Sequence, residues 1–324
     1  MTTTSHATEV LSGKVPVATE TPGNQQVLVS VIIPIYNGLE YIAETLESIR
    51  AQTHKNIEIV VVDDGSTDGT VGFLKAQPDV TLVEQPNQGP GSARNNGASV
   101  ASGDWLAFAD GDDLWVPEKL ELQLAATDEQ DVELVYTNVR TIGDVADLPS
   151  LQHNPEAMPT GDIFVEILND NIMTLSSVMM KRSAFEELGG FGSLPSIRGC
   201  EDWDLWLRYL DSDRKVGAVP EPLVLYRWRS DSMTANHAAM HGSRQSTLDR
   251  ALKSRRALEL SASERRQARA NLFSCSAWFA SRDGNARALR LYMQSVLAGG
   301  SVKEAIRGVA RTVRSRLFRL IGRS

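Results

Sequence analysis

The stretch Trp105-Leu106-Ala107-Phe108-Ala109-Asp110-Gly111-Asp112-Asp113 joins an apolar run to three carboxylates that crowd around a glycine. The apolar run is typical of a buried strand, which ends where the acidic residues begin. Carboxylates this close repel one another unless a cation lies between them. Hard divalent ions such as Mg2+ and Mn2+ prefer oxygen ligands and commonly share them with substrate phosphates. Taken alone, the cluster also fits a solvated acidic turn, so the rest of the chain must decide between the two.

Apolar and amphipathic runs alternate on both sides of this stretch. We expect strands at residues 27–35, 57–62, 80–83, 104–109 and 132–139, and helices at residues 39–52, 69–77, 92–101 and 117–127. This alternation predicts an α/β fold, in which helices cover both faces of a mostly parallel, Rossmann-like sheet. Ligands bind such sheets at the carboxyl ends of the strands. The segments 34–37, 63–66 and 110–113 each follow a strand, so we expect them to converge on one edge.

Two further segments on this side of the sheet carry candidate ligand contacts. In the run Asp63-Asp64-Gly65-Ser66, Asp64 is favoured as a contact to a base or ribose. Asp63 is suited equally to contacting a ligand and to stabilising the turn. The glycine-rich run at 87–97 places Arg94 near a helix start, where it could meet a phosphate or a nucleobase edge. It matches neither the phosphate-loop motif nor the dinucleotide fingerprint.

The segment Gly199-Cys200-Glu201-Asp202-Trp203-Asp204-Leu205-Trp206 predicts a helix with a buried face, because apolar residues recur at helical spacing. Glu201 and Asp202 then lie in its first turn, where the helix dipole favours carboxylates. These carboxylates either stabilise the helix end through their charge, or one of them takes a proton from an incoming hydroxyl.

The composition is that of an ordinary globular protein. The 324 residues carry a net charge of −8, and residues 301–324 hold seven basic residues against one acidic residue, so the remainder carries −14. An acidic body argues against nucleic acid as a partner. Two cysteines fit a reducing compartment, and residues 1–10 lack the pattern of a signal peptide, so we expect a cytoplasmic protein. We expect a disordered segment at 1–26, an α/β domain at 27–240 and a helical C-terminal region at 241–324.

The C-terminal segment 301–324 combines an apolar stripe with arginines. The stripe consists of Ile306, Val309, Ala310, Val313, Leu317, Leu320 and Ile321. A basic amphipathic helix of this kind lies on an anionic membrane at the inner face of the cell, or it packs on the acidic body.

The order of these motifs resembles family 2 glycosyltransferases with the GT-A fold. The resemblance covers about residues 28–230 and rests on five segments: 29–37, 62–68, Asn87 with Gly89 and 93–95, 110–113, and Glu201-Asp202. It implies a nucleotide-sugar donor, most often a UDP-sugar, and transfer with inversion at the anomeric carbon.

Carried over position by position, the resemblance implies a role for each motif. Pro34, Tyr36 and Asp64 would frame the nucleobase and ribose with Arg94 nearby, and Asn37 and Glu201 belong to the same donor-binding motifs. Asp110 and Asp112 match the family's Asp-x-Asp pair. Asp110 would face the ribose or the metal, and Asp112 would bind Mg2+ or Mn2+, which bridges the diphosphate. Asp202 matches the general base. Arg229 stands where the family often has histidine; it cannot ligate a metal but could pair with the diphosphate.

The implied reaction is a single displacement, because the motifs offer one base and no second carboxylate nucleophile. The expected acceptor is a hydroxyl of a surface polysaccharide, glycan or glycolipid, including lipid-linked forms, as in cell-envelope biosynthesis. A sugar nucleotidyltransferase is disfavoured, because no Gly-rich triphosphate loop with Lys or Arg follows the first strand. A non-catalytic nucleotide-sugar-binding protein is disfavoured because all the acidic positions are present.

Overall fold

The computed structural model describes residues 26–143, 150–229, 233, 237–282 and 285–321. Apart from residue 26, the segment predicted to be disordered lies outside these residues. The chain forms two compact units that interleave along the sequence. The sheet unit comprises residues 1–162, 173–190 and 214–229, and the helical unit comprises residues 163–172, 191–213 and 230–324. The predicted domain boundary near residue 240 stays a prediction.

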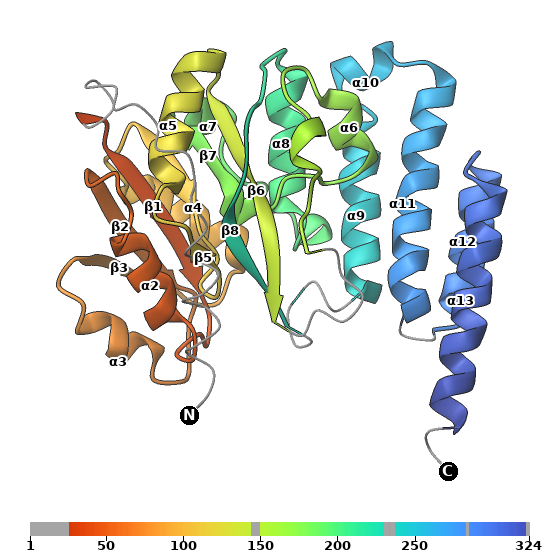
Figure 1. The fold of residues 1–324 in the computed structure, drawn as a ribbon, viewed down its shortest axis with the longest axis horizontal. Coiled ribbons are helices and arrows are strands. Elements are labelled where there is room, and N and C mark those ends of the chain that lie inside the picture. The colour runs from red at the N-terminus through yellow and green to blue at the C-terminus, as the bar shows by residue number, and fades with distance from the viewer. Residues whose placement is uncertain (1–25, 144–149, 230–232, 234–236, 283–284, 322–324) are drawn as a thin grey trace. The chain divides into compact units, whose positions relative to one another are not determined.

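The sheet unit is built on one eight-stranded sheet with the strand order β3-β2-β1-β4-β7-β6-β8-β5 (Figure 1). The strands are β1 (Val29–Ile35), β2 (Ile57–Asp63), β3 (Val80–Glu84), β4 (Trp105–Phe108), β5 (Leu114–Trp115), β6 (Leu134–Gly143), β7 (Val178–Lys181) and β8 (Gly217–Trp228). Strands β3, β2, β1 and β4 are mutually parallel, as predicted. Strand β7 is antiparallel to β4 and β6, β8 is parallel to β6, and β5 is antiparallel to β8. The predicted α/β class is confirmed.

Helices cover both faces of the sheet. They are α2 (Ile42–Arg50), α3 (Thr70–Lys75), α4 (Pro90–Val100), α5 (Lys119–Gln130) and α7 (Arg182–Glu187). Val31 and Ile33 of β1 share one buried cluster with Leu46 of α2, whereas Ile32 points to the opposite face. There, a Cβ on Gly97 of α4 would lie 2.6 Å from Ile32 Cγ2, so only a glycine lets this helix approach so closely.

Several predicted boundaries differ from the observed ones by a few residues. The helix expected from residue 39 begins at Ile42, because the Gly38 carbonyl accepts the N–H groups of Tyr41 and Ile42 and forms the first turn. The helix expected from Pro117 begins at Lys119. Strand β7 is preceded by a 3-10 turn, Leu175–Ser177. Such shifts are typical of element ends, where local caps decide.

The helical unit contains the helix predicted to have Glu201 and Asp202 in its first turn. Its helices are α6 (Phe164–Asn169), α8 (Glu201–Asp211), α9 (His237–Ala251), α10 (Arg255–Glu259), α11 (Ala262–Arg282), α12 (Arg287–Leu297) and α13 (Val302–Ile321). The predicted face of α8 is buried, and Trp203 Nε1 donates to the Ile167 carbonyl at 2.6 Å. Two 3-10 turns, Pro155–Ala157 and Pro195–Ile197, complete the elements. Among the described helices, none has the length and apolarity to cross a membrane.

Candidate active site

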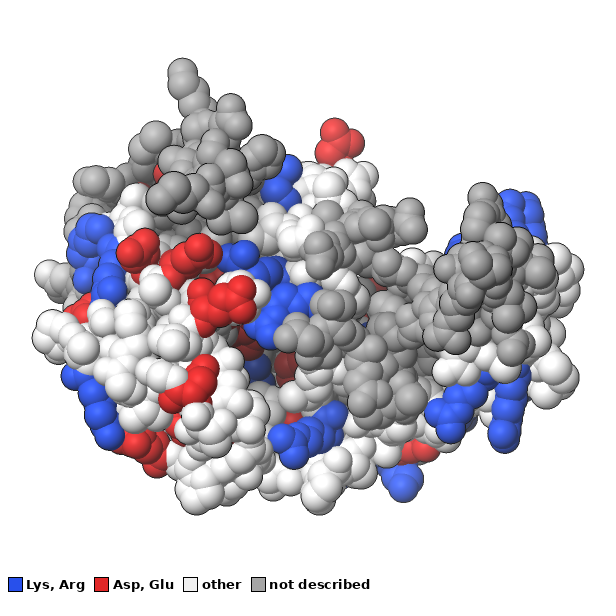
Figure 2. Space-filling model, turned by 90° about the horizontal axis from the view of Figure 1, so that it is seen from below, with Lys and Arg blue, Asp and Glu red and all other residues white. Residues whose placement is uncertain are grey.

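The predicted convergence of the strand ends is observed in the sheet unit. Ile35 at the end of β1 pairs with Asp63 at the end of β2, and Ile32 pairs with Phe108 at the end of β4. The turns after these strands therefore meet at one edge of the sheet. Figure 2 views the molecule from below, toward this edge, and shows acidic and basic side chains lying next to one another. Such an edge is where ligands bind in open α/β sheets.

The turn after β1 presents an exposed aromatic ring above a buried scaffold. Pro34 is buried within β1, whereas the side chain of Tyr36 is 52% exposed. Asn37 adopts a positive φ of 51°. Its Oδ1 accepts from the Thr67 N–H at 2.7 Å, and its own N–H donates to Ser66 Oγ at 2.8 Å. Asn37 thus joins the two turns, while the ring of Tyr36 stays accessible to solvent.

Asp63 and Asp64, which follow each other at the end of β2, accept different hydrogen bonds. Both oxygens of the buried Asp64 accept bonds from the chain: Oδ1 from Gln85 Nε2 and the Gln88 N–H, each at 2.7 Å, and Oδ2 from the Gly89 N–H at 2.8 Å. Oδ2 of Asp63 accepts from two N–H groups of its own turn. Oδ1 of Asp63 is buried and has no hydrogen-bond partner among the described residues. A buried acceptor of this kind is costly unless a ligand or water donates to it.

Arg94 and Asp110 form a partly buried ion pair at the end of β4. Arg94 Nη2 lies 2.7 Å from Asp110 Oδ1, and the Arg94 side chain is almost wholly buried in α4. The Asp110 N–H donates to Ser176 Oγ at 3.0 Å, which fixes the start of the acidic turn. The sequence placed both side chains on this edge, and the structure brings them into contact.

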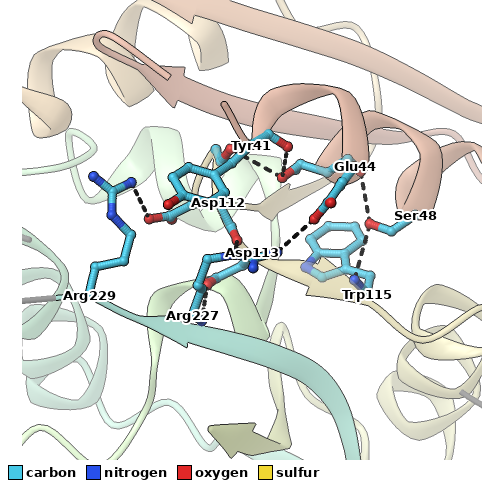
Figure 3. A network of polar contacts seen from close by, with 10 residues as sticks. Tyr41, Glu44, Ser48, Asp112, Asp113, Trp115, Arg227 and Arg229 are labelled. Carbon is cyan, nitrogen blue, oxygen red and sulfur yellow. Dashed lines mark hydrogen bonds and ion pairs between the residues drawn. The ribbon is translucent and has the colours of Figure 1, made fainter. Parts of the chain in front are cut away.

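Asp112 contacts a second arginine, which comes from the end of β8 (Figure 3). Arg229 Nη1 lies 3.2 Å from Asp112 Oδ2, and Arg227 Nε donates to the Asp112 carbonyl at 2.9 Å. Both guanidinium groups also lie over the ring of Tyr41, at 4.9 Å for Arg227 and 4.7 Å for Arg229. An aromatic face attracts cations, so Tyr41 holds the two arginines together. Arg227 additionally pairs with Glu44 at 2.9 Å.

The third carboxylate of the turn, Asp113, points into the protein. It is 1% exposed, and it accepts from Ser176 Oγ and, at 2.9 Å, from the Arg227 N–H. Burial, followed by the charges of Asp110 and Asp112, raises the pKa of Asp113 well above its usual range. Asp113 therefore joins the turn to β7 and β8. Its role was not predicted, nor were those of Tyr41, Ser176 and Arg227.

The pair Asp110 and Asp112 has the chemistry of a divalent-cation site. Burial, and then repulsion from Asp110, raises the pKa of Asp112 to about 6, although Arg229 opposes the shift. Burial and the charge of Asp110 thus both disfavour the ionised form of Asp112, and a bound cation would offset this cost. No group of three or more His, Cys, Asp or Glu side chains that could hold a metal occurs among the described residues. The remaining ligands of such an ion would have to be substrate phosphates and water, as is usual for Mg2+.

Glu201 and Asp202 begin α8 in the helical unit and have different surroundings. The buried Glu201 accepts from the Gly199 N–H at 2.7 Å, which closes the turn before the helix. Asp202 is half-buried; its Oδ2 accepts from Asn171 Nδ2 at 2.8 Å, and its Oδ1 accepts from the Trp203 N–H at 2.7 Å. Glu201 therefore has a structural contact in this turn, and Asp202 is oriented by an amide that the sequence did not single out.

The fold and the sheet-edge cluster define a class: an α/β protein of GT-A type with an acidic, arginine-lined site at its strand ends. Over 90% of the chain, the fold is similar to S. aureus TarS 1–349 in complex with UDP-GlcNAc (TM-score 0.54, 19% identity, 91% of that chain). The sequence model of glycosyl transferase family 2 matches residues 30–189.

Sequence relatives point to the same family. A candidate teichuronic acid biosynthesis glycosyltransferase of Bacillus subtilis, TuaG, is 32% identical over 66% of this chain and 84% of its own length. The B. subtilis protein EpsE, also a candidate glycosyltransferase, is 33% identical over 63% of this chain and 73% of its own. An uncharacterized Rickettsia bellii glycosyltransferase is 33% identical over 64% of this chain, which spans only 29% of that protein. This chain belongs to glycosyltransferase family 2.

Proposed function

We propose that the chain is a metal-dependent, inverting glycosyltransferase that moves a sugar from a UDP-sugar to an acceptor hydroxyl. One observation carries this proposal: the two ion pairs at the strand ends, Arg94 with Asp110 at 2.7 Å and Arg229 with Asp112 at 3.2 Å. A cation bound to a diphosphate presents positive and negative charge side by side. The carboxylates suit the cation, and the arginines suit the phosphate oxygens.

The turns after β1 and β2 are proposed to hold the nucleoside. Tyr36 would stack on the base beside Pro34, because its exposed ring has a free apolar face. Asp63 would accept a hydrogen bond from the base or ribose through Oδ1, the oxygen without a described partner. Asp64 and Asn37 contribute by fixing the turns around this position. The UDP and UDP-GlcNAc complexes of TarS support a uridine nucleotide for a fold of this type.

Asp110 and Asp112 are proposed to hold Mg2+ or Mn2+ together with the diphosphate. When bound, the ion would offset the negative charge that develops on the departing nucleoside diphosphate. Arg229 and Arg94 already lie at these carboxylates, so both could pair with phosphate oxygens with little rearrangement. Arg227 binds the turn through its backbone carbonyl and contacts Tyr41, and it thereby positions Arg229.

Asp202 is proposed to be the general base. Its carboxylate would take the proton from the acceptor hydroxyl while that oxygen forms a bond to the anomeric carbon. The bond from this carbon to the diphosphate oxygen breaks at the same time, so the configuration inverts. Asn171, which donates to Asp202 Oδ2 at 2.8 Å, would hold the carboxylate in the orientation that the proton transfer requires.

The acceptor is proposed to be a surface polysaccharide, glycan or glycolipid, including lipid-linked forms. The name of TuaG, which refers to teichuronic acid biosynthesis, supports a role in polysaccharide biosynthesis. Cytoplasmic location with peripheral contact at the inner face of the membrane remains part of this proposal.

The proposal is tested in two stages with the full chain. A panel of sugar nucleotides is first screened for thermal stabilisation with and without Mn2+, because a bound ligand raises stability by mass action. The donor so identified is then used to measure UDP release with candidate acceptors. Asp202→Asn is expected to lower transfer by about 10²- to 10⁴-fold, while stabilisation by the donor persists. Asp128→Asn, at an exposed carboxylate of α5, serves as the matched control.

Three results would contradict the proposal. Full transfer by Asp202→Asn would exclude this residue as the base. Release of pyrophosphate from a nucleoside triphosphate would instead favour a sugar nucleotidyltransferase. Nucleotide binding that is indifferent to metal, with no turnover, would favour a non-catalytic binding protein.

A further inference from the structure

Helices α12 and α13, the last two of the helical unit that the structure describes, expose large apolar side chains. The set consists of Met293 and Leu297 of α12 and Val302, Ile306 and Val313 of α13. Leu297 is 83% exposed and Ile306 is 65% exposed, so these side chains contact little of the described protein. Leu297 ends α12 and Val302 begins α13, so these two side chains flank the short connection between the helices. We call this set the helix-pair surface.

The exposed residues of α13 lie on a different face from those that pack on the unit. Ala305 is buried in a small core with Leu291 and Tyr292, and Val309 packs against that core. A Cβ on Gly308 would lie 2.0 Å from Tyr292 Cζ, so the ring presses on the helix backbone there. Val302, Ile306 and Val313 follow one another at helical spacing on the adjacent face. Within the predicted apolar stripe, Val309 is thus packed, whereas Ile306 and Val313 are exposed; the side chains of Leu317, Leu320 and Ile321 lie outside the described part.

Basic residues flank the helix-pair surface. Residues 285–313 contain five basic residues, all exposed, and Glu304 is the one acidic residue, which gives a balance of +4. Arg290 lies at helical spacing from Met293 and Leu297. None of Arg290, Lys303 and Arg307 forms an ion pair with a carboxylate of the described residues. These cations are therefore available to an external partner.

We propose that the helix-pair surface binds an anionic lipid surface. Apolar side chains that enter the boundary between headgroups and acyl chains, with cations at their sides, are the pattern of an interfacial helix. A second copy of the same surface is a poorer partner, because both would carry the same positive charge. Nucleic acid would use the cations but not the apolar side chains. The inference deepens the membrane contact included in the proposed function by adding α12 to residues 301–324, and it is independent of sugar transfer, which the donor screen tests separately.

The test is co-sedimentation of the full chain with vesicles. Vesicles of phosphatidylcholine mixed with phosphatidylglycerol are compared with vesicles of phosphatidylcholine alone. Binding is expected to the anionic vesicles, and it should weaken as salt is added, because screening acts on the cations. Absence of binding to the anionic vesicles, or equal binding to the neutral ones, would overturn the proposal.

Two double variants separate the apolar and the charged contributions. Each basic side chain near an anionic surface contributes about fivefold in affinity, so Lys303→Gln with Arg307→Gln should weaken binding about 30-fold. Leu297→Ser with Ile306→Ser should weaken it by at least about tenfold, because each buried side chain contributes strongly to transfer from water. Lys253→Gln with Leu258→Ser is the matched control, since both residues are exposed and belong to the same unit. Circular dichroism and thermal unfolding verify that each variant folds.

The remaining outcomes also decide the matter. An equal loss in the control variant would overturn the proposal, because it would show that the position of the residues is unimportant. Sedimentation that finds a dimer dissolved by the Leu297→Ser and Ile306→Ser pair, without vesicle binding, would assign the surface to a second copy. Duplex DNA binding that only the Lys303→Gln and Arg307→Gln pair removes, without vesicle binding, would assign it to nucleic acid.

Discussion

Replacing Asp112 by asparagine is expected to stabilise the folded protein at pH 8, although it removes a proposed metal ligand. The pKa of Asp112 is raised from 3.8 to about 6, chiefly by burial and by Asp110. A raised pKa means that the folded state binds the proton more tightly than the unfolded state does. The stability linked to this proton is fully present below the unfolded pKa and is lost as the pH rises through about 6.

The magnitude follows from the shift. A difference of about two pKa units corresponds to about 3 kcal/mol, and the Asp112 side chain, at 26% exposure, is shielded enough for most of it to be expressed. Asparagine resembles the protonated carboxyl group and never ionises. Asp112→Asn should therefore raise the free energy of unfolding by up to about 3 kcal/mol at pH 8, and the gain should vanish near pH 4.

Urea unfolding of both proteins across this pH range is the assay. Asp128→Asn is the control, since replacing an exposed carboxylate should change stability by less than about 0.5 kcal/mol. Adding Mn2+ and UDP should stabilise the native protein more than the variant. A variant that is less stable than the native protein at pH 8 without ligand would refute the reasoning, because it would show that burial and Asp110 do not make the ionised Asp112 carboxylate unfavourable in the folded state.

Three further changes test other contacts. Arg229→Ala removes a cation that lowers the pKa of Asp112, so this pKa should rise further and the acid limb of the pH–rate profile should move to higher pH; an unchanged limb would exclude the contact. Tyr36→Ala should weaken donor binding about three- to tenfold through loss of stacking, with little change in melting temperature; titration calorimetry measures the affinity, and unaltered affinity would remove Tyr36 from the donor site. Gly97→Ala should destabilise the fold by about 1–3 kcal/mol in urea unfolding, because its Cβ would lie 2.6 Å from Ile32 Cγ2; unchanged stability would show that the helix can shift.

The sequence was sufficient for the framework of the sheet and for most residues at its edge. Alternating strands and helices place Ile35, Asp63 and Phe108 at the ends of neighbouring parallel strands, and this arrangement is observed. The different hydrogen bonds of Asp63 and Asp64 could not be predicted from the sequence. Neighbouring side chains at a strand end point in different directions, and which one meets the chain depends on the loop that packs there.

Contacts between segments far apart in the chain could not be predicted from the sequence either. Arg227 and Glu44 are 183 positions apart, and no local pattern pairs them. The arrangement of Tyr41 between two arginines arises only because β8 runs past the start of α2 at the acidic turn (Figure 3). Periodicity describes one element at a time, so a cluster drawn from three elements leaves no signature in it.

The inward orientation of Asp113 matters for how variation at this turn is interpreted. Its carboxylate holds Ser176 and the backbone of Arg227, so most replacements would leave buried donors without acceptors. A mutational scan would therefore score all three acidic positions as intolerant, for two unrelated reasons. Loss of protein abundance would accompany changes at Asp113, whereas under the proposed function changes at Asp112 would lower transfer activity and leave the cellular level of the protein intact.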